Sequence, residues 1–234
     1  MGYTQDYPMS KCRLSLFAAS VALILSAFSA EADDLKTPEA VASFSASHYD
    51  AINSLKAICT STSAAAMGGM SLPLQATARI EFQRPGAMRV DGTDTFNHTY
   101  GFAVAPGQAM LFTNGSWTKE ASPDLALAAV TATAQGTATT VPALLLHTIW
   151  GYPFGPLGYT PNVGAEAIAG RKCYRIAKAL AGMVEIFWID KKTGLVVKEQ
   201  AQATLGGIHV VTNRTYKYEA INRPIEPSVF VMPH

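Results

Sequence analysis

The spacing of apolar residues first indicates a helix, near the start of the main part of the chain. Thr37 before Pro38 supplies a helix N-cap and a first helical position, and Glu39 places an acid in the first turn. The apolar residues that follow recur with helical spacing at Val41, Phe44, Ile52, Leu55 and Ile58. We therefore predict one amphipathic helix, followed by a loop in the stretch rich in Ser, Ala and Gly at residues 60–69.

From residue 76 onward the period changes to two, which indicates strands. Ala78, Ile80 and Phe82 alternate with polar residues before an Arg-Pro-Gly turn. Further strands are expected at residues 88–90, 99–104, 109–113, 117–120, 165–169, 172–179, 184–190, 195–203, 208–219 and 228–232. Two helices should lie between these groups of strands, one from Ser122 toward Gln135 and one from Val141 through Trp150. Successive hairpins with a few separate helices predict an α+β domain on one large antiparallel sheet.

The first residues have the pattern of an export signal. Two basic residues precede a charge-free apolar run at residues 14–28, which is shorter than the ~20 residues that span a bilayer. The run is followed by the A-x-A pattern of a signal peptidase site that ends at Ala32. We predict that residues 1–32 are a signal peptide and that residues 33–234 form one mature periplasmic domain. The alternative is a retained N-terminal membrane anchor.

The net charge bears on nucleic-acid binding, and the cysteine content bears on disulfide formation. The chain has 18 basic and 17 acidic residues, a net charge of +1, which does not indicate binding to nucleic acid. Of the three cysteines, Cys59 and Cys173 belong to the predicted mature domain. In an oxidising compartment they could form a disulfide, and the alternative is two separate buried thiols.

No pattern of catalytic or metal-binding residues is found in the sequence. It has no G-x-S-x-G nucleophile motif, and its five histidines lack the spacing of a metal site. His147, on an apolar helix, is expected to be a core or edge histidine. The acids Glu81, Glu185, Glu199 and Glu219 lie in alternating strands, where a solvated face explains them. We therefore predict no catalytic residue, metal or cofactor.

Four segments, taken in order, resemble a known family. They are IEFQRPGAMRV (residues 80–90), FAVAPGQAMLF (102–112), GRKCYRI (170–176) and EIFWID (185–190). Together they resemble the LolA/LolB-like superfamily of periplasmic lipoprotein carriers, nearest to a less characterised branch of predicted periplasmic proteins. The resemblance implies an unclosed antiparallel β-barrel, or half-barrel, with helices that cover its concave apolar face.

Both the family resemblance and the strand pattern indicate a role for Arg84. This arginine falls on the same side of its strand as Ile80 and Phe82, and a buried guanidinium needs hydrogen-bond partners. In the carriers the matching arginine is thought to hold the helical lid shut, and Arg84 inherits that role; the alternative is an arginine that reaches solvent. The residues predicted to contact a ligand are Ile80, Phe82, Arg84, Trp150, Phe154 and Trp188. Residues 152–159, rich in aromatics, Gly and Pro, form either a flap over this site or a packed loop.

The leading hypothesis is therefore a non-enzymatic periplasmic carrier or binding protein for a lipid, a lipoprotein or another apolar ligand. Its expected partner is a lipid or a lipidated protein, with an envelope protein as a further candidate, and the protein would be peripheral to a membrane at most. One alternative is an envelope-associated adaptor that uses the same fold with a filled cavity, and another is a hydrolase with an unrecognised site. A cavity between sheet and helices would favour the carrier, and a solid core would favour the adaptor.

Overall fold

The computed structural model describes residues 35–67, 70–133, 136–147, 154–155, 158–180, 182–206 and 208–232. All of these belong to the second of two compact units in the chain, residues 33–234. The predicted signal peptide lies outside the described residues and stays a prediction.

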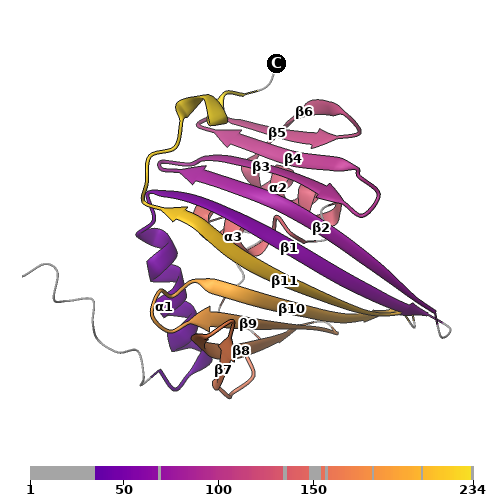
Figure 1. The fold of residues 1–234 in the computed structure, drawn as a ribbon, viewed down its shortest axis with the longest axis vertical. Coiled ribbons are helices and arrows are strands. Elements are labelled where there is room, and N and C mark those ends of the chain that lie inside the picture. Colours follow the sequence, from indigo (N-terminus) through magenta and orange to yellow (C-terminus); the bar gives the residue numbers. More distant parts are fainter. Residues whose placement is uncertain are drawn as a thin grey trace, which may run out of the picture. The chain divides into compact units, whose positions relative to one another are not determined.

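The domain is built on one antiparallel sheet of eleven strands (Figure 1). The strands are β1 (Ser54–Met67), β2 (Met70–Gln83), β3 (Ala87–Asp94), β4 (Thr99–Ala105), β5 (Gln108–Thr113), β6 (Ser116–Glu120), β7 (Gly164–Ile168), β8 (Arg171–Leu180), β9 (Met183–Asp190), β10 (Val196–Leu205) and β11 (Ile208–Ile221). Their spatial order is β6-β5-β4-β3-β2-β1-β11-β10-β9-β8-β7. Strands β6 and β7 are the two edges, so the sheet is not closed, and the predicted α+β half-barrel is confirmed.

In the described part of the chain, three α-helices lie against the sheet, namely α1 (Pro38–Asp50), α2 (Pro123–Thr133) and α3 (Thr140–Leu146). Figure 1 shows α2 and α3 behind the strands; α2 packs on β4, β5 and β6, and α3 contacts α1. The first two helices begin as the sequence predicts, because the Thr37 hydroxyl accepts from the Ala40 N–H and the Ser122 hydroxyl accepts from the Leu125 N–H. Among the described residues no helix has the length and apolar character needed to cross a membrane.

The face of the sheet that these helices cover forms the core. Side chains alternate between the two faces of a strand, and in β2 the alternate residues Ala78, Ile80 and Phe82 are completely buried. The register with β1 places Leu55 opposite Phe82 and Ala57 opposite Ile80, both also completely buried. The covered face is therefore packed with apolar side chains along its central strands.

Most predicted strands are confirmed, but the segment after the first helix is not a loop. The helix ends at Asp50, so Leu55 and Ile58 lie in β1, and the stretch at residues 60–69, expected to be a loop, is strand as far as residue 67. The physical reason is tertiary pairing, because β1 hydrogen-bonds to β2 on one side and to β11 on the other. The hydrogen bonds to these two neighbouring strands outweigh the weak strand propensity of the Ser and Ala residues in β1.

Two further predictions at element ends are wrong. The third helix stops at Leu146, because His147 adopts a left-handed conformation with φ of 54° and ends the helical hydrogen bonding. The expected continuation to Trp150 lies outside the described residues. The predicted strand at residues 228–232 is instead a short 3-10 helix, η1 (Pro227–Phe230), which begins with a proline and packs near β3 and β4.

Candidate functional site

Arg84 lies immediately after β2 and reaches the end of helix α1. Its Nε donates to the carbonyl of Ile52 at 3.1 Å, and its Nη2 donates to the carbonyls of Tyr49 and Asp50, each at 3.2 Å. Its guanidinium also lies 5.2 Å from the centre of the Phe82 ring. A cation at the carboxyl end of a helix is favourable because the unpaired carbonyls there carry partial negative charge. A buried Arg84 was expected to need hydrogen-bond partners, and these partners are backbone carbonyls at the end of α1.

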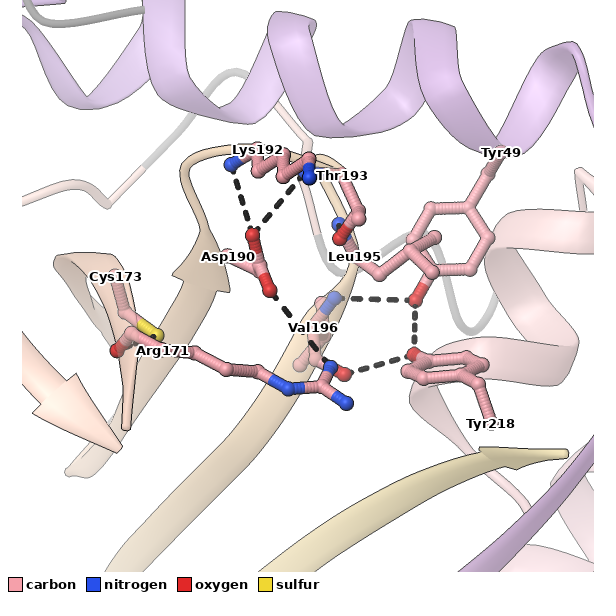
Figure 2. A network of polar contacts seen from close by, with 9 residues as sticks. All are labelled: Tyr49, Arg171, Cys173, Asp190, Lys192, Thr193, Leu195, Val196 and Tyr218. Carbon is pink, nitrogen blue, oxygen red and sulfur yellow. Dashed lines mark hydrogen bonds and ion pairs between the residues drawn. The ribbon is translucent and has the colours of Figure 1, made fainter. Parts of the chain in front are cut away.

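A second polar contact holds α1 to the sheet through Tyr49. Figure 2 shows this hydroxyl meeting the Tyr218 hydroxyl of β11 at 2.6 Å and accepting from the Val196 N–H of β10 at 3.2 Å. The Tyr218 hydroxyl donates in turn to the Val196 carbonyl at 2.7 Å, so Tyr49 must be the donor to Tyr218. Burial raises the pKa of both tyrosines. This closed set of hydrogen bonds ties α1 to two strands at once.

A third contact joins α1 to the turn between β9 and β10. The Ser45 hydroxyl donates to the Gly194 carbonyl at 2.6 Å. Asp190 shapes this turn, because its Oδ1 accepts from the backbone N–H groups of Lys192 and Thr193 (Figure 2). Gly194 has a φ of 67°, and a Cβ there would lie 2.6 Å from the His48 ring of α1. The helix and the turn therefore fit closely only because this position is glycine.

Beneath α3 the covered face holds a buried cluster of charged and polar groups. Glu199 of β10 is 1% exposed and pairs with Arg214, its neighbour across the sheet on β11. The Tyr216 hydroxyl donates to Glu199 Oε2 at 3.2 Å, and the Thr140 hydroxyl of α3 donates to the same oxygen. One carboxylate thus receives donors from the sheet and from the cover.

The sequence-based placement on a solvated face is wrong for Glu199 and Glu185, which lie on the covered face, and for Glu81, which faces outward but is only 8% exposed. The β9–β10 register shifts between Val196 and Lys198, and after this irregularity Glu199 shares the covered side with Ala201. A usable signal was present, because small apolar residues follow Glu199 at every second position and two tyrosines follow Arg214 in the same way. An acid and an arginine at matching places in two such strands could have indicated a buried pair.

In this buried cluster the Glu199–Arg214 ion pair lies beside groups whose pKa values burial raises. Burial lowers the pKa of Arg214, but Glu199 together with Tyr216, Cys59 and Glu185 outweighs it, so the net shift is upward and the guanidinium stays charged. Glu185 lies on the same face of β9, and burial together with Glu199 raises its pKa. Burial, with a smaller contribution from Glu199, also raises the pKa of the Cys59 thiol to about 12.

The segment that contains α2 and α3 also makes polar contacts with β4 and with α1. The Tyr100 hydroxyl of β4 lies 2.7 Å from the Thr137 hydroxyl, just before α3, and donates to the Thr77 carbonyl at 3.2 Å. At the other end of α3, His147 Nε2 lies 3.3 Å from Asp50 Oδ1 at the end of α1. His147 is therefore an exposed helix-terminal residue rather than a core histidine.

The structure brings together some, but not all, of the residues predicted to contact a ligand. Ile80 and Phe82 lie on the covered face with no exposed surface. Phe154 is also buried and packs edge-on against Phe187 of β9, with ring centres 5.4 Å apart. Trp150 lies outside the described residues, as does half of the predicted flap at residues 152–159.

The placement of Trp188 with this group is wrong. Neighbouring residues of a strand point to opposite faces, so Phe187 faces the helices and Trp188 faces away from them. Its indole Nε1 donates to Glu166 at 2.7 Å, and Arg175 and Lys198 lie over its ring. Trp188 thus belongs to a separate apolar cluster on the outer face.

The two cysteines also lie on opposite faces. Cys59 is opposite Ala78 on the covered face, whereas Cys173 packs against Trp188 in the outer cluster. Both are buried free thiols, which is the second of the two alternatives left by the sequence. A disulfide between them would have to pass through the sheet.

A groove of about 650 Å³ lies over the other half of the sheet. The outward-facing residues that line it include Ile58, Thr77, Arg79, Asp91 and Glu219. Arg79 and Glu219 form an ion pair at 3.5 Å across it. The groove therefore combines this ion pair with apolar side chains such as Ile58 and Phe112, and it lies away from the face that the helices cover. Within the described ranges, no three side chains of His, Cys, Asp or Glu come together as a metal site.

Comparison with known proteins gives similarity at the level of solved structures alone. No family model matches the chain, and no curated protein matches its sequence. The chain is similar to the lipoprotein LppX of Mycobacterium tuberculosis, with 15% identity and a TM-score of 0.46 over 80% of this chain and 96% of that one. LprF from Mycobacterium bovis gives 11% identity and 0.46 over 80% and 94%. A LolA superfamily protein from Nitrosomonas europaea gives 7% and 0.34 over 84% and 98%. Similarities at this level carry no argument about a ligand or a partner.

Proposed function

We propose that the protein is a non-enzymatic periplasmic binding or carrier protein that holds a lipid, a lipidated protein or another apolar ligand between the sheet and its helices. The observation that carries this proposal is the apolar covered face of an unclosed sheet. Phe82, Phe102 and Phe187 of the sheet and Leu127 and Leu144 of the helices are all buried to within 1%. An acyl chain could replace the helical side chains in the same apolar contacts.

Differences in how the helices are fastened support an opening between α3 and α1. Helix α1 is held by Arg84, by the Tyr49 hydroxyl and by Ser45, and the last two contacts are buried. The contact between α3 and α1 through His147 and Asp50 is about half exposed, with side chains 47% and 57% accessible. Exposed pairs of this kind contribute little, at most about 1 kcal/mol. Helix α3 is also held to the sheet by the buried hydrogen bond from Thr140 to Glu199, which would break on opening. In this proposal α1 stays in place, fastened by Arg84, and α3 with α2 forms the part of the cover that moves.

The available free energy is sufficient for binding. Each buried methylene contributes about 0.8 kcal/mol, so about ten methylenes give roughly 8 kcal/mol before the costs of association, the scale of a micromolar complex. Ile80, Phe82 and Phe154 would line the bound chain.

The proposal is tested with the mature domain, residues 33–234, purified from the periplasm of an expressing cell. Extracted lipids are identified by mass spectrometry, and the delipidated protein is titrated with a fluorescent fatty-acid probe. Copurifying lipid or saturable probe binding in the micromolar range is the expected result. If neither is seen, the carrier proposal fails.

The proposed periplasmic location rests on the predicted signal peptide. A carrier of lipids or lipidated proteins in that compartment would take part in outer-membrane biogenesis. N-terminal sequencing of the secreted protein should give a chain that begins after Ala32. A chain that keeps residues 1–32 and stays with the inner membrane would contradict this.

A second candidate, an envelope-associated adaptor, is favoured by the packing of the covered face. Ile80, Phe82 and Phe102 have no exposed surface, as a filled core would require. The same purification distinguishes the two candidates. An adaptor would bring an envelope protein with it in fixed proportion and would carry no lipid.

A further inference from the structure

A binding site for acyl chains alone would be lined by apolar side chains. The covered face instead also holds a buried cluster of charged and polar residues, namely Glu199, Arg214, Tyr216 and Thr140. Burying two charges is expensive, and a pair of well-packed apolar residues is often at least as stable. The pair here is nevertheless buried, with side-chain exposures of 1% for Glu199 and 11% for Arg214. It lies on the same face as Cys59 and Ala78, within the apolar surface that the proposed ligand would contact.

The donors to Glu199 come from two parts of the structure that would separate on opening. Arg214 and Tyr216 both belong to β11 and would stay with the carboxylate. The Thr140 hydroxyl belongs to α3 and would leave with the cover. Gly136, just before α3, also packs on the Arg214 guanidinium so closely that a Cβ there would clash with it. Lifting this segment therefore uncovers a carboxylate oxygen that has lost one donor.

The charges of the cluster decide which chemical group can replace that donor. Glu199 already balances Arg214, and Glu185 on the next strand is a second acid near the same place. Lys178 of β8 lies opposite Glu185, so Arg214 and Lys178 each have a carboxylate beside them. Among the described residues of this cluster, an additional anion would therefore meet no unbalanced cation. A hydroxyl or an amide N–H, in contrast, restores the hydrogen bond that Thr140 made and adds no charge.

Resting on the proposed function, we propose that this cluster is a head-group site that selects neutral amphiphiles with a hydroxyl or amide donor, such as monoacylglycerols, over fatty-acid anions. Glu199 accepts from the ligand's donor, and Arg214 and Tyr216 hold the carboxylate in position. The acyl chain of the same ligand lies along the apolar part of the covered face.

The test compares three ligands of one chain length, namely a monoacylglycerol, the fatty-acid anion and its methyl ester, which has no donor. Delipidated wild-type protein should bind the monoacylglycerol about tenfold or more tightly than the ester, as expected for one hydrogen bond to a charged acceptor. It should bind the anion no more tightly than the ester.

Two variants identify the origin of that preference. In Glu199→Gln the carboxylate charge is lost and Arg214 is unbalanced, so the order should reverse in favour of the fatty-acid anion. In the double variant Glu199→Leu with Arg214→Leu, both charges are replaced by apolar groups, and all three ligands should bind with similar affinity. Arg79→Met, on the outer face, is the matched control and should keep the wild-type order.

The outcomes separate this inference from the proposed function. If wild-type protein binds all three ligands equally, or if Glu199→Gln keeps the wild-type order, the head-group site is wrong while apolar binding stands. If no ligand binds to wild-type protein, the proposed function fails and this inference fails with it. Circular dichroism and a thermal melt of each variant show that the comparison is made between folded proteins.

Discussion

The contact between Arg84 and the end of α1 leads to a quantitative prediction about how that helix is held. Arg84→Met keeps much of the side-chain length but removes its three hydrogen bonds to the carbonyls of Tyr49, Asp50 and Ile52. It also removes a cation from the negative end of the helix. The carbonyls that remain cannot be paired by methionine.

The size of the effect follows from these contacts. A typical hydrogen bond contributes about 0.5–1.5 kcal/mol net, so three give roughly 1.5–4.5 kcal/mol. The contact with Asp50 is exposed, and water can replace it there. We therefore expect Arg84→Met to lower the free energy of unfolding by about 2–3 kcal/mol, in the lower half of that range.

Two measurements check this value and its location. Urea unfolding gives the global change, and hydrogen exchange followed by mass spectrometry reports on the peptide that contains α1. Exchange should become faster in the last turn of α1, whereas the buried contact of Ser45 should still protect the middle of the helix.

Arg79→Met is the matched control, because Arg79 lies on the same strand but faces outward. Its side chain is 56% exposed and pairs with Glu219 at 3.5 Å. Substitution there should change stability by no more than about 0.5 kcal/mol. If Arg84→Met is no more destabilising than Arg79→Met and exchange in α1 does not change, the reasoning that Arg84 fastens this helix is refuted.

Three further predictions follow from buried polar groups. Tyr218→Phe removes the donor to the Val196 carbonyl and should lower the free energy of unfolding by about 1–3 kcal/mol, measured with urea; no loss would contradict the role of that hydrogen bond. Burial and Glu199 raise the pKa of Glu185, so folded protein loses stability as pH rises from the ordinary value of about 4.3 through the raised pKa. Glu185→Gln should therefore become progressively more stable than wild type across that window in melts from pH 4 to 8, and a difference that is constant with pH would argue against it. Cys59 and Cys173, both buried, should react with a thiol reagent only after denaturation, and rapid labelling of native protein would show that either thiol is accessible.

The sequence predicted most strands because their period of two is a local property. It failed at β1, where Ser and Ala residues carry little strand preference and the structure depends on pairing with β11, far away in the chain. It also failed to assign the faces of β9, because residues 186–189 are apolar on both sides and alternation alone does not say which side the helices cover.

The same reasoning explains the incomplete prediction of the site. Arg84 could be found because its side of the strand was visible from the local pattern. Glu199 was missed because an acid in an alternating strand ordinarily faces water, and its burial depends on an irregularity in β10 and on a helix far away in sequence.

The pairing of β1 with β11 has a consequence for how the domain assembles. Strands β1 to β6 form one run of neighbours and β7 to β11 another, and these two runs are joined at the β1–β11 ladder. As a chain emerges with its amino end first, hairpins within the first run can form early. The ladder that unites the two runs must wait for the last strand, and contacts so distant in sequence slow folding. Until then β1 exposes an unpaired edge, and such edges are surfaces through which chains aggregate. An unfinished copy of this domain would therefore need protection during the interval before β11 arrives.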